Sequence, residues 1–119
     1  MSTQEIANRF YELAQQGQWN DILDKYFSED ASSIEPAHAQ GFPTLTQGME
    51  NIKTKGKKWA EMVEEVHGGF CKEPQVGGNF FACAMGMDVT LKGQGRQQMD
   101  EIALYEVKDG KIISEQFFY

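Results

Sequence analysis

The acidic residues Glu101 and Glu115 are the first candidates for chemistry in this chain. Each lies in an expected β-strand, where alternation places it on one face with mostly apolar side chains. The first face holds Met99, Glu101, Ala103, Tyr105 and Val107, and the second holds Ile113, Glu115, Phe117 and Tyr119. If both faces point inward, one carboxyl would hold a proton that it could donate, because two neighbouring carboxyls do not both ionise cheaply. A β-bulge would turn either face outward, and the acids would then pair with Lys or Arg at the surface.

The two histidines are candidates of a different kind. His38 follows Glu35-Pro36 in an expected loop, where a titrating imidazole could act as an acid/base partner or as a gate. The alternative is an ordinary solvated loop histidine, because loops lie at the surface. His67 is expected at the end of a helix, where its cationic form suits the helix dipole, and we interpret it as structural.

The two cysteines lie symmetrically about Gly77. If the chain turns at that glycine, Cys71 and Cys83 face each other across two strands, and a shift of one residue in the turn separates them. We expect free thiols in a reducing compartment. Cys83 belongs to an apolar face, which favours a core position over a nucleophilic role.

Several classes of function are disfavoured by the sequence. It contains no Ser-His-Asp order, no glycine-rich phosphate loop and no cluster of metal ligands, so we expect no cofactor and no metal. The net charge of −7 argues against nucleic acid and against an anionic membrane as partners. The one basic cluster, Lys53, Lys55, Lys57 and Lys58, is typical of a solvated helix face. No apolar run reaches membrane-spanning length and no signal peptide is evident, so the expected location is cytoplasmic.

Hydrophobic periodicity predicts helices in the first half of the chain and strands in the second. The 119 residues, of which 40% are apolar, suit one domain, residues 1–119. Helices are expected over residues 3–16 and 19–26, and a third from Gly48 to Gly68, with an apolar stripe that includes Val63 and Val66. A turn at 28–30, a short strand at 32–35 and a loop up to Gly48 should lie between the second and third helices. Strands are expected over residues 69–75, 79–91, 96–107 and 111–119, with an Asp109-Gly110 hairpin turn before the last. This order predicts an α+β fold with the helices on one face of a curved sheet.

The strand over residues 79–91 has two unlike faces. Its odd positions are apolar and mostly large, which predicts that they face the helices: Phe81, Cys83, Met85, Met87, Val89 and Leu91. Its even positions include Ala82, Ala84 and Gly86, which would let a second sheet approach closely. We therefore expect a homodimer through this outer face, and a solvated sheet face is the alternative.

Three short motifs lie at or between the expected helices and strands. They are an aromatic residue followed by an acidic-Ala pair within Tyr26 to Ala31, Gly48 before the third helix, and Gly110-Lys111-Ile112 at the start of the last strand. Together with the order itself, which covers nearly the whole chain, they resemble the NTF2-like superfamily, and within it the SnoaL-like and ketosteroid-isomerase-like proteins. The resemblance implies a cone, in which three N-terminal helices pack in the concave face of a strongly bent, mainly antiparallel sheet. It also implies an apolar pocket between helices and sheet.

The resemblance also implies roles for single residues. Ketosteroid-isomerase-like proteins carry a carboxylate base just before a proline, and Glu35 holds that position here. In an apolar pocket the pKa of Glu35 would rise toward the range useful for proton transfer; a rim glutamate in water is the alternative. Their oxyanion donors align with Phe10 and Ala103, which cannot donate, so we do not expect a ketosteroid isomerase of the usual kind. An inward Ala103 implies that Glu101 and Glu115 also point inward.

The implied pocket wall is largely aromatic and sulfur-containing. Its residues would be Phe10, Trp19, Trp59, Cys83, Met85, Met87, Ala103, Tyr105, Glu115, Phe117 and Tyr119. The expected function is binding of a small apolar molecule that bears a carbonyl or hydroxyl group, with isomerase- or cyclase-like turnover. Glu35 would be the base, and His38 or Glu101 the assisting acid. The alternative is a non-enzymatic ligand-binding or dimerisation module, since one fold can host both.

Overall fold

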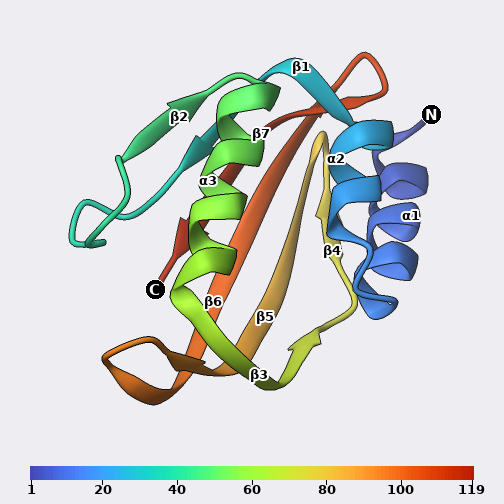
Figure 1. Cartoon of the computed structure of the whole chain (residues 1–119). Helices are drawn as coiled ribbons and strands as arrows, with labels where there is room; N and C mark the ends of the chain where they lie inside the picture. Colours follow the sequence, from blue (N-terminus) through green and yellow to red (C-terminus); the bar gives the residue numbers. More distant parts are fainter.

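Three helices and a curved seven-stranded sheet make up the protein, whose computed structural model describes residues 1–119 (Figure 1). The helices are α1 (Thr3–Gln15), α2 (Trp19–Tyr26) and α3 (Met49–Met62). The strands are β1 (Phe27–Ile34), β2 (Leu45–Gln47), β3 (Val63–Cys71), β4 (Gln75–Gly77), β5 (Phe80–Leu91), β6 (Gly95–Lys108) and β7 (Lys111–Phe118). The sheet order is β2-β1-β7-β6-β5-β3, with β4 also paired to β5, and only the β1–β7 pair is parallel. The predicted α+β class is confirmed, and no helix is long and apolar enough to cross a membrane.

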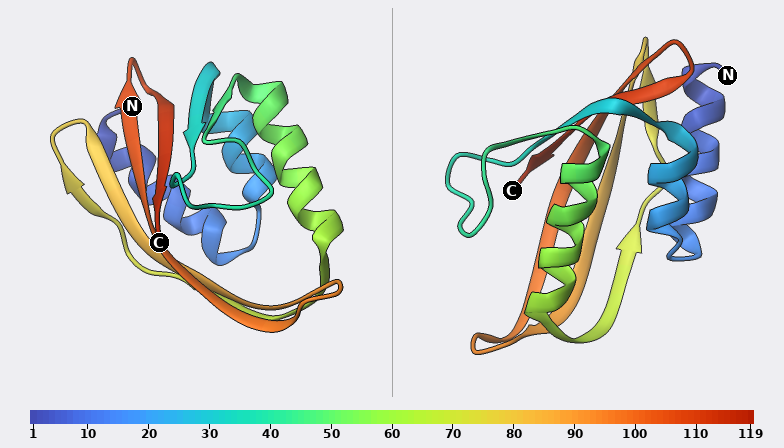
Figure 2. Two further views of the ribbon diagram at one scale, coloured as in Figure 1. Left: turned by 90° about the vertical axis from the view of Figure 1, so that its left-hand side faces the viewer. Right: turned by 45° about the horizontal axis from the view of Figure 1, so that its top comes forward.

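The sheet curls around the helices because its longest hairpin, β5–β6, is bent along its length (Figure 2). All three helices lie on the concave side. Helix α1 starts with a capping box, in which Ser2 and Glu5 satisfy each other's backbone N–H groups. Its residues Ile6 and Phe10 are 0% and 1% exposed, so this helix supplies much of the core. The prediction that the large face of residues 79–91 looks toward the helices is confirmed, with Phe81 and Cys83 each 1% exposed.

The predicted boundary between α3 and the next strand is wrong. The helix ends at Met62, and Val63 begins β3, whose Val66 pairs with Val89 of β5. Both valines are β-branched and therefore fit a strand, but their spacing also continued the helical stripe. His67 consequently lies in β3 and not at a helix end, and its Nε2 is 2.7 Å from the Thr90 hydroxyl oxygen.

The segment after α2 also differs from the prediction. The expected turn at residues 28–30 is part of β1, which runs without interruption from Phe27 to Ile34. The expected loop before Gly48 contains the short strand β2, which pairs with the end of β1. The register of β1 against β7 shifts between Phe27 and Ser32, so polar turn-like residues are accommodated in an irregular strand.

The hairpin that joins β6 to β7 turns at Asp109-Gly110, as predicted, with φ angles of 51° and 75°. A bulge follows, because Glu106 pairs with Ser114 while Val107 pairs with Ile112. Ile112 is therefore the buried residue, at 0% exposure, and the expected inward position of Ile113 is wrong. Beyond the bulge the predicted alternation holds, so Glu115 and Phe117 face the concave side of the sheet.

Cys71 and Cys83 are both buried and free. They do not face each other directly, because Cys71 pairs with Met85. The turn lies at Gly78 and Asn79, beyond Gly77, and this offset moves the two thiols to diagonal positions.

Candidate functional site

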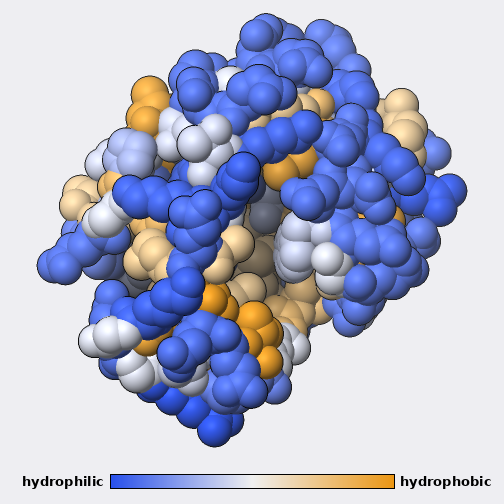
Figure 3. All heavy atoms as spheres, viewed as in Figure 1, coloured by the Kyte–Doolittle hydropathy of each residue, from blue (hydrophilic) through white to orange (hydrophobic).

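A cavity of about 590 Å³ lies between the helices and the concave face of the sheet. Figure 3 shows a hollow in this face of the molecule with apolar residues beside it. Of its 29 lining residues 18 are hydrophobic, and its volume lies in the range of small-molecule sites. The polar and charged lining residues include Glu35, His38, Gln40, Lys55, Gln94, Gln97, Asp100, Glu101 and Glu115.

The structure brings most of the expected wall residues to this cavity. These are Phe10, Trp19, Trp59, Met85, Met87, Tyr105, Glu115, Phe117 and Tyr119. Cys83 and Ala103 are exceptions, because they lie in the core at 1% and 0% exposure and do not line the cavity. The ring of Phe10 lies 4.6 Å from that of Tyr105 and 5.4 Å from that of Phe81, and these three rings belong to the same buried core cluster as Cys83 and Ala103.

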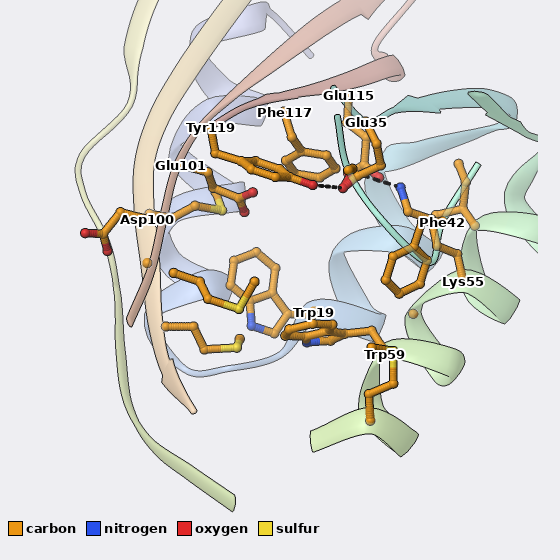
Figure 4. Close-up of a pocket in the computed structure, with 18 of the residues that line it drawn as sticks. Trp19, Glu35, Phe42, Lys55, Trp59, Asp100, Glu101, Glu115, Phe117 and Tyr119 are labelled. Carbon is orange, nitrogen blue, oxygen red and sulfur yellow. Dashed lines mark hydrogen bonds and ion pairs between the residues drawn. The ribbon is translucent and has the colours of Figure 1, made fainter. Parts of the chain in front are cut away.

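Glu35 directly follows β1, and its backbone is held by a hydrogen bond from its N–H to the carbonyl of Thr44, 2.8 Å long. Its side chain is 10% exposed, so it is not a rim residue in water. Oε1 accepts a hydrogen bond of 3.0 Å from the Tyr119 hydroxyl, and Oε2 lies 3.2 Å from Nζ of Lys55 (Figure 4). Each carboxylate oxygen therefore has a donor, and the group is fixed in orientation.

Lys55 is the functional-site residue that sequence reasoning missed. It was expected on a solvated face, but its side chain is only 15% exposed. Its Nζ donates to Oγ of Ser33 at 2.8 Å and lies 5.4 Å from the centroid of the Phe117 ring. The signal was its spacing, three residues after the buried Ile52 and four before Trp59, which places all three on one helix face.

The other three lysines of that cluster lie at the surface, as predicted. Lys57 and Lys58 are exposed, and Lys58 donates to the carbonyl of Gly41 at 2.6 Å. Lys53 forms an ion pair of 2.7 Å with the largely exposed Asp24.

Glu101 and Glu115 both line the cavity, from β6 and β7. Burial raises the pKa of Glu101 to about 7, and the charges of Glu35 and Glu115 add to the rise while Lys55 opposes it. Burial also raises the pKa of Glu115, against the effects of the Ser33 hydroxyl and Lys55. Near neutral pH the Glu101 carboxyl therefore carries its proton in a large share of the molecules. Asp100, the neighbour of Glu101, points away from the other labelled side chains (Figure 4).

Tyr119 and His38 lie together at the cavity and are both exposed. Their rings meet edge to face, with centroids 5.6 Å apart. Burial and the Glu35 charge raise the pKa of Tyr119 to about 12, so its hydroxyl stays a hydrogen-bond donor at physiological pH. His38 lies exposed at the rim of the cavity. This position suits a gate better than an enclosed acid.

The arrangement is suited to proton transfer in an apolar setting. An ion-paired carboxylate, Glu35, and a carboxyl that retains its proton near neutrality, Glu101, lie in one cavity. A carboxylate held by a cation, close to a buried carboxyl that keeps its proton, is a combination that general acid/base catalysis can use. No group of three or more His, Cys, Asp or Glu side chains is arranged to hold a metal ion.

Comparison with known proteins agrees with this architecture. The family model of the SnoaL-like domain matches residues 1–119. A solved structure from Mesorhizobium loti, assigned as a SnoaL-like polyketide cyclase, is 41% identical, with a TM-score of 0.91 and coverage of 100% of both chains.

More distant structures share the fold alone. A cystatin-like protein of unknown function from Xanthomonas campestris is 21% identical, with a TM-score of 0.81 over 99% of this chain and 90% of that one. A hypothetical protein with a ketosteroid-isomerase-like fold from Catenulispora acidiphila, in complex with trimethylamine, is 21% identical, with a TM-score of 0.68 over 84% and 73%. No curated protein matches the chain. The full-length family match and the 41% identical structure show that the chain belongs to the SnoaL-like family.

Proposed function

We propose that the cavity binds a small apolar molecule that bears a carbonyl or hydroxyl group, and that the protein moves a proton on it in an isomerase- or cyclase-like reaction. The observation that carries this proposal is the convergence of Glu35 and Glu101 in one largely apolar cavity. The relative from M. loti is described both as a SnoaL-like polyketide cyclase and as a carbohydrate phosphatase, and the first description supports the same class of chemistry.

Glu35 is the base in the proposed reaction. Its carboxylate takes a proton from the carbon next to the ligand's carbonyl, and the electron pair of that C–H bond moves to the carbonyl oxygen and leaves an enolate. Glu101, in its protonated form, then returns a proton to oxygen or to a second carbon, or the enolate carbon attacks a second carbonyl and closes a ring. After ring closure the proton from Glu101 goes to the alkoxide formed on the attacked carbonyl. At the end of the cycle Glu35 releases its proton to water and Glu101 takes one up from water, so both groups return to their starting forms. His38, at the rim, is the alternative acid.

The test starts from binding and proceeds to proton transfer. A panel of small ketones, phenols and sterols is first screened for an increase in melting temperature. Exchange of the α-protons of the best-binding ketone is then followed by NMR in deuterated water. Glu35→Gln should slow exchange roughly 100-fold or more, the usual share of a general base. Glu50→Gln is the matched control, because Glu50 is exposed on α3 outside the cavity lining. Equal exchange by the wild type and E35Q would contradict the proposal.

A second candidate function is ligand binding without turnover. It is favoured by Phe10 and Ala103, which occupy the positions where the resemblance implied oxyanion donors and which are buried and apolar. This candidate predicts the same thermal stabilisation by ligands but no α-proton exchange above that of the buffer.

A further inference from the structure

Removal of an α-proton leaves a negative charge on the ligand's oxygen. In an apolar cavity that charge needs a donor, and the loss of one such donor commonly costs a factor of about 100 to 1000 in rate. Neither Phe10 nor Ala103 can supply it. The hydroxyl proton of Tyr119 is already donated to Oε1 of Glu35, and Glu101 delivers its proton only in the later step. The reaction proposed above therefore requires another group close to the base, since the carbonyl oxygen and the α-carbon are bonded to the same carbon.

Lys55 is the only lysine or arginine among the residues that line the cavity. Its ammonium nitrogen lies 3.2 Å from Oε2 of Glu35, so a ligand whose α-carbon contacts Glu35 has its oxygen within reach of Lys55. An ammonium group carries three N–H donors, and Ser33 and Glu35 account for two.

We infer that Lys55 is the electrophilic residue of this site, and that it stabilises the oxyanion that forms when Glu35 takes up a proton. This inference rests on the proposed function. In the resting site the Lys55 ammonium is balanced by the Glu35 carboxylate. When Glu35 becomes neutral, the negative charge passes to the ligand's oxygen and Lys55 keeps an anionic partner. The cavity therefore never holds an unbalanced ammonium, whose burial would be costly.

The same charge balance predicts anion binding that needs no turnover. A Glu35→Gln variant leaves Lys55 without its carboxylate partner. The oxygen of a planar aromatic anion should bind to Lys55 instead. The probe is 4-nitrophenol at neutral pH, whose visible absorption band reports the phenolate form. E35Q should bind the phenolate at least about tenfold more tightly than the wild type, which corresponds to ~1.4 kcal/mol.

Lys55 variants separate a direct role from one of holding Glu35 in place. E35Q/K55Q should lose the added phenolate affinity, whereas E35Q/K55R, which retains the positive charge, should keep most of it. E35Q/K57Q is the matched control, because Lys57 is exposed on the same helix and does not line the cavity. The comparison of E35Q with the wild type does not depend on whether a Lys55 variant folds.

The inference is overturned if E35Q binds phenolate no better than the wild type, or if E35Q/K55Q binds it as tightly as E35Q. Its failure differs from failure of the proposed function. Tight phenolate binding by E35Q without α-proton exchange by the wild type would retain Lys55 as an anion-binding residue and reject turnover. Exchange by the wild type without phenolate binding by E35Q would reject Lys55 alone.

Discussion

The hydroxyl of Tyr119, the last residue, donates a hydrogen bond of 3.0 Å to Oε1 of Glu35, 84 residues earlier in the sequence. The residue that follows β7 is therefore part of the candidate site. Because Tyr119 binds Oε1 and Lys55 binds Oε2, the plane of the Glu35 carboxylate is fixed.

Tyr119→Phe should slow α-proton exchange by about tenfold, because hydrogen bonds to charged groups contribute ~1.4 kcal/mol or more. The fold should be retained, since the Tyr119 side chain is half-exposed. Tyr11→Phe is the matched control, because it removes the same hydroxyl from a residue of α1 that does not line the cavity. Unchanged exchange in Y119F, measured by NMR, would show that this hydrogen bond has no role in orienting the base.

The contributions of Lys55 and Glu35 to the free energy of unfolding should be coupled, because the two residues form an ion pair. Lys55→Met leaves a carboxylate largely buried without its cation, and should lower the free energy of unfolding in urea by about 3 kcal/mol. E35Q/K55M should recover most of that loss, because both charges are gone. Lys53→Met, which breaks a surface pair with Asp24, should cost far less. Equal losses in K55M and K53M would mean that solvent screens both pairs alike.

Much of this architecture could be predicted from the sequence, because local signals decided it. Apolar spacing placed α1 and α2, Asp109-Gly110 placed the last hairpin, and alternation separated the two faces of β5. The end of α3 was not decided locally. Val63 and Val66 fit both periods, and pairing with β5 determined the outcome.

Part of the candidate site could also be predicted from the sequence. Alternation predicted the inward direction of Glu115, but no local pattern marked the bulge at Ile113 that puts Ile112 on the same face. Lys55 was hidden because a lysine among lysines resembles a solvated surface. Its burial arises from contacts with Ser33 of β1 and with Glu35 just after that strand, both distant in sequence.

The stability of the protein should fall as the pH rises through the range in which Glu101 ionises. Its pKa in the folded state is about 7, above the ordinary value of 4.5, so the folded state retains a proton that the unfolded state releases. Below pH 4.5 the protonated Glu101 raises the free energy of unfolding by at most about 3 kcal/mol relative to high pH. This contribution declines as the pH rises to about 7 and is absent at higher pH.

Glu101→Gln should remove this part of the pH dependence. Urea unfolding of the wild type and E101Q between these pH values isolates it from Glu115, whose pKa is also raised. Parallel curves for the two proteins would place Glu101 in water.

The outer face of the sheet should join two copies of the chain. Ile102 and Phe118 are paired neighbours on β6 and β7 and are 46% and 48% exposed, beside the small residue Ala84. Ile102→Glu should convert a dimer to a monomer in sedimentation velocity. Leu45→Glu, at a more exposed position on β2, should leave the dimer intact. A monomeric wild type would reject this interface.

The most direct test of the account is an NMR titration of the Glu101 side-chain carboxyl in the wild type and in E35Q. A cavity shared by the two acids predicts a pKa of about 7 in the wild type and a lower value in E35Q, because the neighbouring charge is gone. A value near 4.5 in both proteins would contradict the claim that Glu101 and Glu35 act on a ligand in one apolar cavity.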